Sequence, residues 1–227
     1  MVNPMDLTGK SILFIRDSSS LNNAIIDQLH ILGGKVTILD SLQISITESI
    51  VKEIVRKDGP FDGLVYGIVH SDFRPIRFVT PEITDMLMHD NYGIFIEVIR
   101  VLIKSKGLRN GASVVAMSSI SSIRAMKAKT VFCSAKAALD AAVRCLAAEL
   151  GNKGIRVNSV QKGVVDTDLE KTHIQNVTAL NDNATKCRQI VGLTKAMEVA
   201  NVVAFLISDA THTITGTSII IDGGYTL

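Results

Sequence analysis

The chain has 227 residues, of which 47% are hydrophobic and 20% charged, and its formal net charge is +2. This length and apolar content predict a single α/β domain over residues 1–227, with helices on both faces of a sheet. The basic residues are spread out, which excludes nucleic acid and anionic membranes as expected partners. No apolar run reaches the roughly 18 residues of a spanning helix, and no signal core opens the chain, so we expect a cytoplasmic protein.

Three cysteines, Cys133, Cys145 and Cys187, lack the spacing of metal ligands. We therefore expect no metal site, and reduced thiols that are mostly buried.

The first forty residues predict the opening of a parallel βαβ unit. A short apolar run over residues 10–15 predicts a buried strand, and the polar turn from Arg16 to Ser20 follows it. Apolar residues then recur at helical spacing over residues 21–32. Residues 35–40 predict the second strand, which ends at an acid, Asp40.

The rest of the chain continues the alternation of strands and helices. A brief third strand is expected over 44–47, too close to the second for a helix between them. A helix beginning at Thr80-Pro81-Glu82 should run to about residue 106, with breaks near Asp90-Asn91. The other predicted helices cover 48–56, 133–150 and 197–206, and the other strands 62–69, 112–119, 155–160 and 217–224.

The helix over residues 133–150 is rich in alanine and apolar on most sides, with Asp140 and Arg144 on one polar face. A sheet can cover only one side of it, so we expect a subunit interface on the other. Residues 168–194 are polar and weakly periodic, which predicts a mobile region or lid.

Several motifs together resemble the short-chain dehydrogenase/reductase family, from about residue 7 to the end. They are Leu7-Thr8-Gly9-Lys10, Ser118-Ser119, Lys136-Ala137-Ala138-Leu139, Gly154-Ile155-Arg156-Val157-Asn158, Gly163-Val164-Val165-Asp166-Thr167, and Ile214-Thr215-Gly216 through Asp222-Gly223-Gly224. The resemblance implies a Rossmann-like, doubly wound parallel sheet, usually of seven strands. It also implies a homodimer or homotetramer built on the helices near 92–106 and 133–150.

The resemblance implies hydride transfer between NAD(P) and a carbonyl or alcohol, with Asn, Ser, Tyr and Lys at the catalytic site. By position, Asn91, Ser119 and Lys136 match three of these residues. Phe132 stands at the tyrosine position and has no ionisable oxygen. General acid–base assistance is typically worth roughly 10²–10⁴-fold, so ordinary family chemistry should be lost or severely weakened.

The cofactor motif departs from the family pattern as well. The three glycines of the family's phosphate-binding turn align with Arg16, Ser20 and Asn22. Arg16 would crowd the adenosine, or else would bind a phosphate together with Ser18, Ser19 and Ser20. The plainer alternative is that Arg16 is a solvated turn residue. Asp40 matches the acid that favours NAD over NADP.

NAD or NADP binding is therefore expected to be weakened or absent. The remaining positions that the resemblance assigns to cofactor binding are Leu21, Gly67, Lys136, Val165 and Thr167.

Three functional hypotheses follow. The leading one is a divergent family member, an oxidoreductase by resemblance, that has lost tyrosine-dependent catalysis and serves as a ligand-binding or partner subunit. The alternative is an active NAD(P)-dependent carbonyl reductase or alcohol dehydrogenase with a substitute proton donor, such as Tyr66, Tyr92 or His70. In the third, the chain only stabilises an active paralogue. A small-molecule ligand is expected, but the sequence names no substrate.

Overall fold

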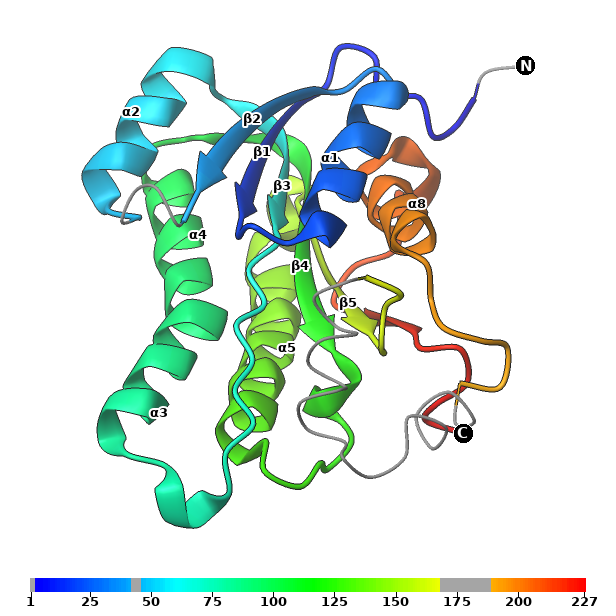
Figure 1. The fold of residues 1–227 in the computed structure, drawn as a ribbon. Helices are drawn as coiled ribbons and strands as arrows, with labels where there is room; N and C mark the ends of the chain where they lie inside the picture. Colours follow the sequence, from blue (N-terminus) through cyan, green and yellow to red (C-terminus); the bar gives the residue numbers. More distant parts are fainter. Residues whose placement is uncertain (1–2, 42–45, 168–188) are drawn as a thin grey trace.

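A six-stranded parallel sheet forms the centre of the computed structural model, which describes residues 3–41, 46–167 and 189–227 (Figure 1). The order of the strands is β2-β1-β3-β4-β5-β6, and every neighbouring pair is parallel. The strands are β1 (Ser11–Arg16), β2 (Lys35–Asp40), β3 (Phe61–Tyr66), β4 (Leu108–Ser119), β5 (Arg156–Lys162) and β6 (Ser218–Ile221). This is the expected Rossmann-like sheet.

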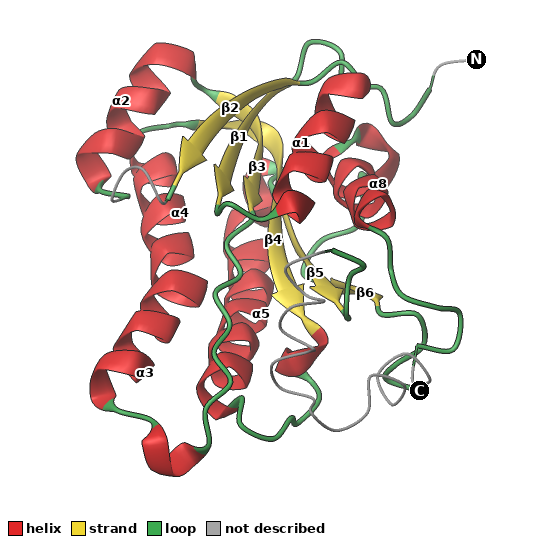
Figure 2. Cartoon of the chain, in the orientation of Figure 1, coloured by secondary structure: helices red, strands yellow, loops and turns green. Residues whose placement is uncertain are grey.

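Helices cover both faces of the sheet (Figure 2). The α-helices are α1 (Ser20–Ile31), α2 (Glu48–Asp58), α3 (Pro81–Met88), α4 (Ile94–Lys104), α5 (Thr130–Leu150) and α8 (Ala196–Ile207). Shorter helical turns are η1 (Ile76–Phe78), η2 (His89–Gly93), η3 (Ile120–Ser122), η4 (Gly151–Lys153) and η5 (Asp209–Thr211). None of the described helices is long and apolar enough to cross a membrane.

The alternation of side chains along β1 builds two separate cores. Leu13 and Ile15 face one way and join the core that contains residues of α2, α4 and α5. Ile12 and Phe14 face the other way and pack with α1 and α8. This period of two is the reason why short, wholly apolar strands are buried on both faces.

The chain reverses its direction of travel across the sheet between β1 and β3. From β1 the order runs outward to β2 on one side, and from β3 to β6 on the other. In doubly wound sheets, ligands bind outside the carboxyl ends of the strands at such a reversal.

The expected third strand is not formed by the described part of its range. Ile46 and Thr47 belong to no strand, while residues 44 and 45 lie outside the described residues. Thr47 instead caps α2, accepting a hydrogen bond from the Ile50 amide, which makes α2 the crossover helix between β2 and β3. The described sheet thus has six strands where the family resemblance implied seven.

The break expected near Asp90-Asn91 is confirmed. Thr80 caps α3 and Pro81 occupies its first turn. The π-helical turn η2 then separates α3 from α4. Such π-turns occur often at functional sites.

Two expectations for α5 were wrong. Asp140 is buried rather than part of a solvated polar face, because it accepts hydrogen bonds from Ser118, Ser159 and Gln161. Cys145 is exposed, because it lies on the outer side of α5 next to the exposed Arg144.

Candidate functional site

A cleft with a volume of about 730 Å³ opens at the carboxyl ends of β1, β3, β4 and β5. Among the predicted site residues, the cleft wall contains Ser18, Leu21, Gly67, Ser119, Phe132, Val165 and Thr167. Those outside its lining are Arg16, Ser20, Asn22, Asp40, Asn91 and Lys136. The expected lid over 168–194 falls, for residues 168–188, outside the described residues.

The turn between β1 and α1 contains an acid that sequence reasoning missed, Asp17. Its Oδ1 accepts hydrogen bonds from the Ser19 amide (2.9 Å) and from Asn22 Nδ2 (2.7 Å), and its Oδ2 accepts one from the Val69 amide (3.0 Å). Asp17 also lines the cleft. A carboxylate therefore takes the backbone amide of the N-cap, Ser19, which would otherwise be available to a bound phosphate. Its place two residues before the N-cap, Ser19, was the available signal.

Asn22, at the third glycine position, fills the space between this turn and β3. It is 1% exposed, and its Nδ2 donates to the Gly67 carbonyl (3.2 Å) as well as to Asp17. A Cβ added to Gly67 would lie 2.4 Å from Asn22 Oδ1. Only glycine fits at position 67 beside this asparagine.

Arg16 is neither a solvated turn residue nor positioned on the cleft. Its Nη2 lies 2.9 Å from Asp40 Oδ2, and its Nη1 donates to Asn23 Oδ1. The parallel register of β1 and β2 pairs Arg16 directly with Asp40, which explains the contact. The acid expected to hold a ribose is thus already engaged by a guanidinium.

Lys136 lies beneath the cleft rather than in its wall. Its Nζ donates to the carbonyls of Met117 (2.9 Å) and Ile68 (3.1 Å), and the residue has no exposed surface. Burial lowers the pKa of Lys136 to about 7, although the nearby carboxylate of Asp140 opposes the shift. The ammonium group ties β4 to the segment after β3.

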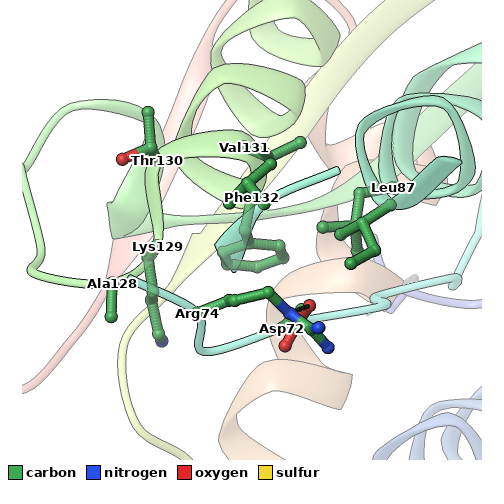
Figure 3. Close-up of a pocket in the computed structure, with 10 residues that line it drawn as sticks. Asp72, Arg74, Leu87, Ala128, Lys129, Thr130, Val131 and Phe132 are labelled. Carbon is green, nitrogen blue, oxygen red and sulfur yellow. Dashed lines mark hydrogen bonds and ion pairs between the residues drawn. The ribbon is translucent and has the colours of Figure 1, made fainter. Parts of the chain in front are cut away.

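Phe132 separates the cleft from a small second cavity of about 10 Å³, room for a single water. Its ring projects toward the loop that carries Arg74, with Leu87 beside it (Figure 3). The ring is 3% exposed, and its centre lies 6.0 Å from Lys136 Nζ. The residue at the tyrosine position thus packs as a core side chain and brings no hydroxyl to the cleft.

Ser119 lies in the cleft wall with 8% exposure. Its Oγ accepts a hydrogen bond from the Ser121 amide (3.2 Å) and donates to Ser121 Oγ (3.1 Å). The hydroxyl is therefore held in place by the turn that follows β4.

Asn91 binds the segment after β3 through its side chain. Its Oδ1 accepts from the His70 amide (3.1 Å), and its Nδ2 donates to the carbonyls of His70 (2.7 Å) and Leu87 (2.9 Å). The neighbouring Asp90 contacts the same residue, with 2.7 Å between Asp90 Oδ2 and His70 Nδ1. Both His70 and Asp90 line the cleft.

Tyr66, one of the candidate substitute donors, is not placed to act as a proton donor. It is fully buried, and its hydroxyl donates to the Asp90 carbonyl. Burial, together with the charges of Asp90 and Asp17, raises the pKa of Tyr66 well above its ordinary value.

No group of three or more His, Cys, Asp or Glu side chains gathers into a metal site within residues 3–41, 46–167 and 189–227.

Comparison with known proteins decides the family. A family model described as enoyl-(acyl carrier protein) reductase matches residues 9–226. This chain belongs to the short-chain dehydrogenase/reductase family. It is 31% identical to an L-xylulose reductase of Caenorhabditis elegans over 183 residues, which cover 80% of this chain and 72% of the relative.

Two further comparisons give a second related sequence and a solved structure with the same fold. An enoyl-(acyl-carrier-protein) reductase (NADH) of Buchnera aphidicola is 27% identical, over 96% of this chain and 85% of the relative. The crystal structure of the FabI–NADH complex from Alistipes finegoldii has the same fold, with a TM-score of 0.86 and 19% identity. It aligns with 98% of this chain over 89% of its own.

Proposed function

We propose that this chain is an NAD(P)-dependent oxidoreductase that interconverts a carbonyl compound and an alcohol, with a proton donor other than tyrosine. One observation carries the proposal: the family's Ser119 and a hydrogen-bonded His70–Asp90 pair line the same large cleft at the carboxyl ends of the strands. Relatives that are named as reductases favour this reading over a chain without turnover.

The residues around the cleft fit a nicotinamide dinucleotide, with one opposing charge. A volume of about 730 Å³ is in the range of cofactor pockets. Ser18, Leu21, Gly67, Val165 and Thr167 would line its path. When bound, the cofactor would supply the hydride. The negative charge of Asp17 would repel the pyrophosphate of the cofactor. We therefore expect a lower affinity for the dinucleotide than a glycine-rich turn would give.

The chain's own groups divide the remaining work. Ser119 Oγ would orient the carbonyl oxygen of the substrate by turning its hydroxyl proton from Ser121 Oγ to the ligand, while it keeps the hydrogen bond from the Ser121 amide. Lys136, bonded to Ile68 and Met117, holds the floor of the cleft rather than lowering the pKa of a tyrosine. The proton has to come from another group in the cleft wall, because Phe132 has none to give.

A ligand-binding or partner subunit without turnover is the second candidate. It is favoured by the apolar packing of Phe132 and by the engagement of Lys136 with backbone carbonyls.

A thermal-shift series with NAD, NADH, NADP and NADPH tests the proposal first. A ligand at about 100 times its Kd stabilises the folded chain by about 2.7 kcal/mol. Reduction of L-xylulose, D-erythrulose and a short enoyl thioester should then be followed through the loss of reduced cofactor. If none of the four dinucleotides raises the melting temperature at millimolar concentration, the proposal is overturned. Binding without any turnover would favour the second candidate.

We also propose that two or four copies assemble through α4 and α5. The outer side of α5 carries small or apolar exposed side chains such as Ala137 and Ala148, which let a second helix approach closely. The cytoplasmic location stays a prediction.

A further inference from the structure

We propose that His70 is the proton donor that replaces the missing tyrosine, and that Asp90 and Asn91 are the residues that position it. The inference rests on the proposed carbonyl-reducing function. It assigns a new use to the asparagine position of the family, because Asn91 acts here through a histidine that follows β3.

The backbone of His70 is fixed on both sides. Asn91, which is wholly buried, accepts from the His70 amide and donates to the His70 carbonyl. The preceding residue, Val69, donates its amide to Asp17 Oδ2. The carbonyl of Ile68, two residues before His70, accepts a hydrogen bond from Lys136 Nζ. These contacts hold the backbone around His70 in one place.

The imidazole is oriented by a carboxylate. Asp90 Oδ2 lies 2.7 Å from His70 Nδ1, so in the neutral ring Nδ1 carries the proton that Asp90 accepts. Within the described part of the chain, Nε2 has no hydrogen-bond partner, and the side chain keeps 41% exposure. A carboxylate on Nδ1 and a free Nε2 form the arrangement in which histidine transfers protons in other enzymes.

Asp90 is itself held by the irregular helix. It belongs to the π-helical turn η2, and its carbonyl accepts the hydroxyl of the buried Tyr66. The π-turn brings Asp90 and Asn91, neighbours in sequence, onto the same histidine from the α3–α4 side. The π-helical turn is therefore the feature that lets both side chains contact His70.

His70 also lies on the same cleft as the family's catalytic positions. Ser119 and Phe132 line that cleft with it. The other charged side chains of the cleft wall are Asp17, Lys127, Lys129 and Lys162, in addition to Asp90. A proton transfer from His70 would therefore take place among these charges.

The proposed reduction transfers a hydride to carbon and a proton to oxygen. The carbonyl carbon of the substrate receives a hydride from a reduced nicotinamide dinucleotide, and the electron pair of the C=O π bond moves to oxygen. That oxygen takes the proton from Nε2 of the imidazolium form of His70, which gives the alcohol. His70 is left neutral, with its Nδ1–H still on Asp90, and regains a proton from water.

Turnover of His70→Gln gives the first test. We expect the rate of carbonyl reduction to fall roughly 10²–10⁴-fold, while the Kd for the reduced cofactor stays within about twofold. His89→Gln is the matched control, because His89 is exposed, belongs to the same π-turn and is not part of the cleft lining.

A readout that needs no cofactor is the tautomer of His70, measured by long-range ¹H–¹⁵N correlation on the labelled full chain. We expect the proton of the neutral ring on Nδ1, and a shift to Nε2 in Asp90→Ala. Unchanged turnover in His70→Gln, or a neutral wild-type ring that carries its proton on Nε2, would overturn the role of His70. If the wild type binds the cofactor but reduces no carbonyl, the proposed function is overturned instead. The tautomer measurement would then still show whether His70 Nδ1 is paired with Asp90.

Discussion

Asp17 is the residue that most changes the cofactor end of the cleft. Its carboxylate accepts three hydrogen bonds that join the β1–α1 turn, Asn22 and the segment after β3. It gives the turn rigidity, and it places a negative charge where a dinucleotide would bring two more.

Asp17→Ala should raise the affinity for NADH. Removing one like charge close to a bound phosphate is worth roughly 1 kcal/mol even where water screens it, which is about fivefold in Kd. The gain should shrink as salt rises. The control is Asp27→Ala, which removes the same charge from the exposed side of α1. Equal affinities of Asp17→Ala and the wild type would show that Asp17 does not limit binding.

Lys136 should leave a signature in the pH dependence of stability. Its pKa is about 7 in the folded chain and ordinarily 10.5, so between these values the unfolded chain binds more protons. The free energy of unfolding should therefore rise with pH from about 7 to 10.5, by at most about 1.4 kcal/mol per pH unit, and the penalty is complete below pH 7. Urea titrations should show this rise in the wild type and lose it in Lys136→Met.

Lys57→Met, on the exposed side of α2, should keep the rise seen in the wild type. If the free energy of unfolding varied with pH in the same way in Lys136→Met and in the wild type, the Lys136 side chain would be charged in the folded chain over this whole pH range.

At the scale of elements, Arg156 ties β5 to the end of α8. The buried guanidinium donates to the carbonyls of Leu206 (2.8 Å) and Ser208 (3.0 Å) and to Thr211 Oγ1 (2.6 Å). These are carbonyls at the C-terminal end of a helix, which lack partners within it and favour a positive charge.

Arg156→Met should lower the free energy of unfolding by about 2–4 kcal/mol, because it removes three charge-assisted hydrogen bonds to buried acceptors. Denaturant unfolding measures the loss. Arg144→Met, on the exposed side of α5, should change stability by less than about 0.5 kcal/mol. A similar small change in Arg156→Met would mean that water replaces the guanidinium.

The pattern of apolar residues predicted most elements, and it also predicted the break within the α3–α4 helix. It could not show where polar side chains find partners far along the chain. Asp140 and Arg144 have the spacing of a surface ion pair, yet Ser118 and Ser159 from two strands bury the carboxylate. The Arg16–Asp40 pair likewise depends on the register of β1 and β2.

The same limit applied to the candidate site. The family resemblance predicted the edge of the sheet that carries the cleft, because the carboxyl ends of parallel strands coincide. The link from Asp17 to the Val69 amide (3.0 Å) and the pairing of His70 with Asp90 (2.7 Å) join segments that are distant in sequence, which no local pattern contains.

At the scale of the whole molecule, an assembly through α4 and α5 makes a direct prediction. Ala137→Glu adds a charge to the exposed side of α5, where a single chain tolerates it and a helix–helix interface does not. Light scattering should then give the mass of one chain, 24.5 kDa, in place of a multiple of it. Ser49→Glu on α2 is the control. A variant that keeps the wild-type mass would remove α5 from the interface.

The central claim is that a chain with phenylalanine at the tyrosine position still transfers hydride. Its most direct test uses NADH or NADPH that carries deuterium at the reactive carbon, together with a ketose such as L-xylulose, and mass spectrometry of the product. The account predicts one deuterium in the alcohol formed by the wild-type chain, and at least a hundredfold less in His70→Gln. Saturating, bound cofactor with no deuterium in any alcohol product would contradict it.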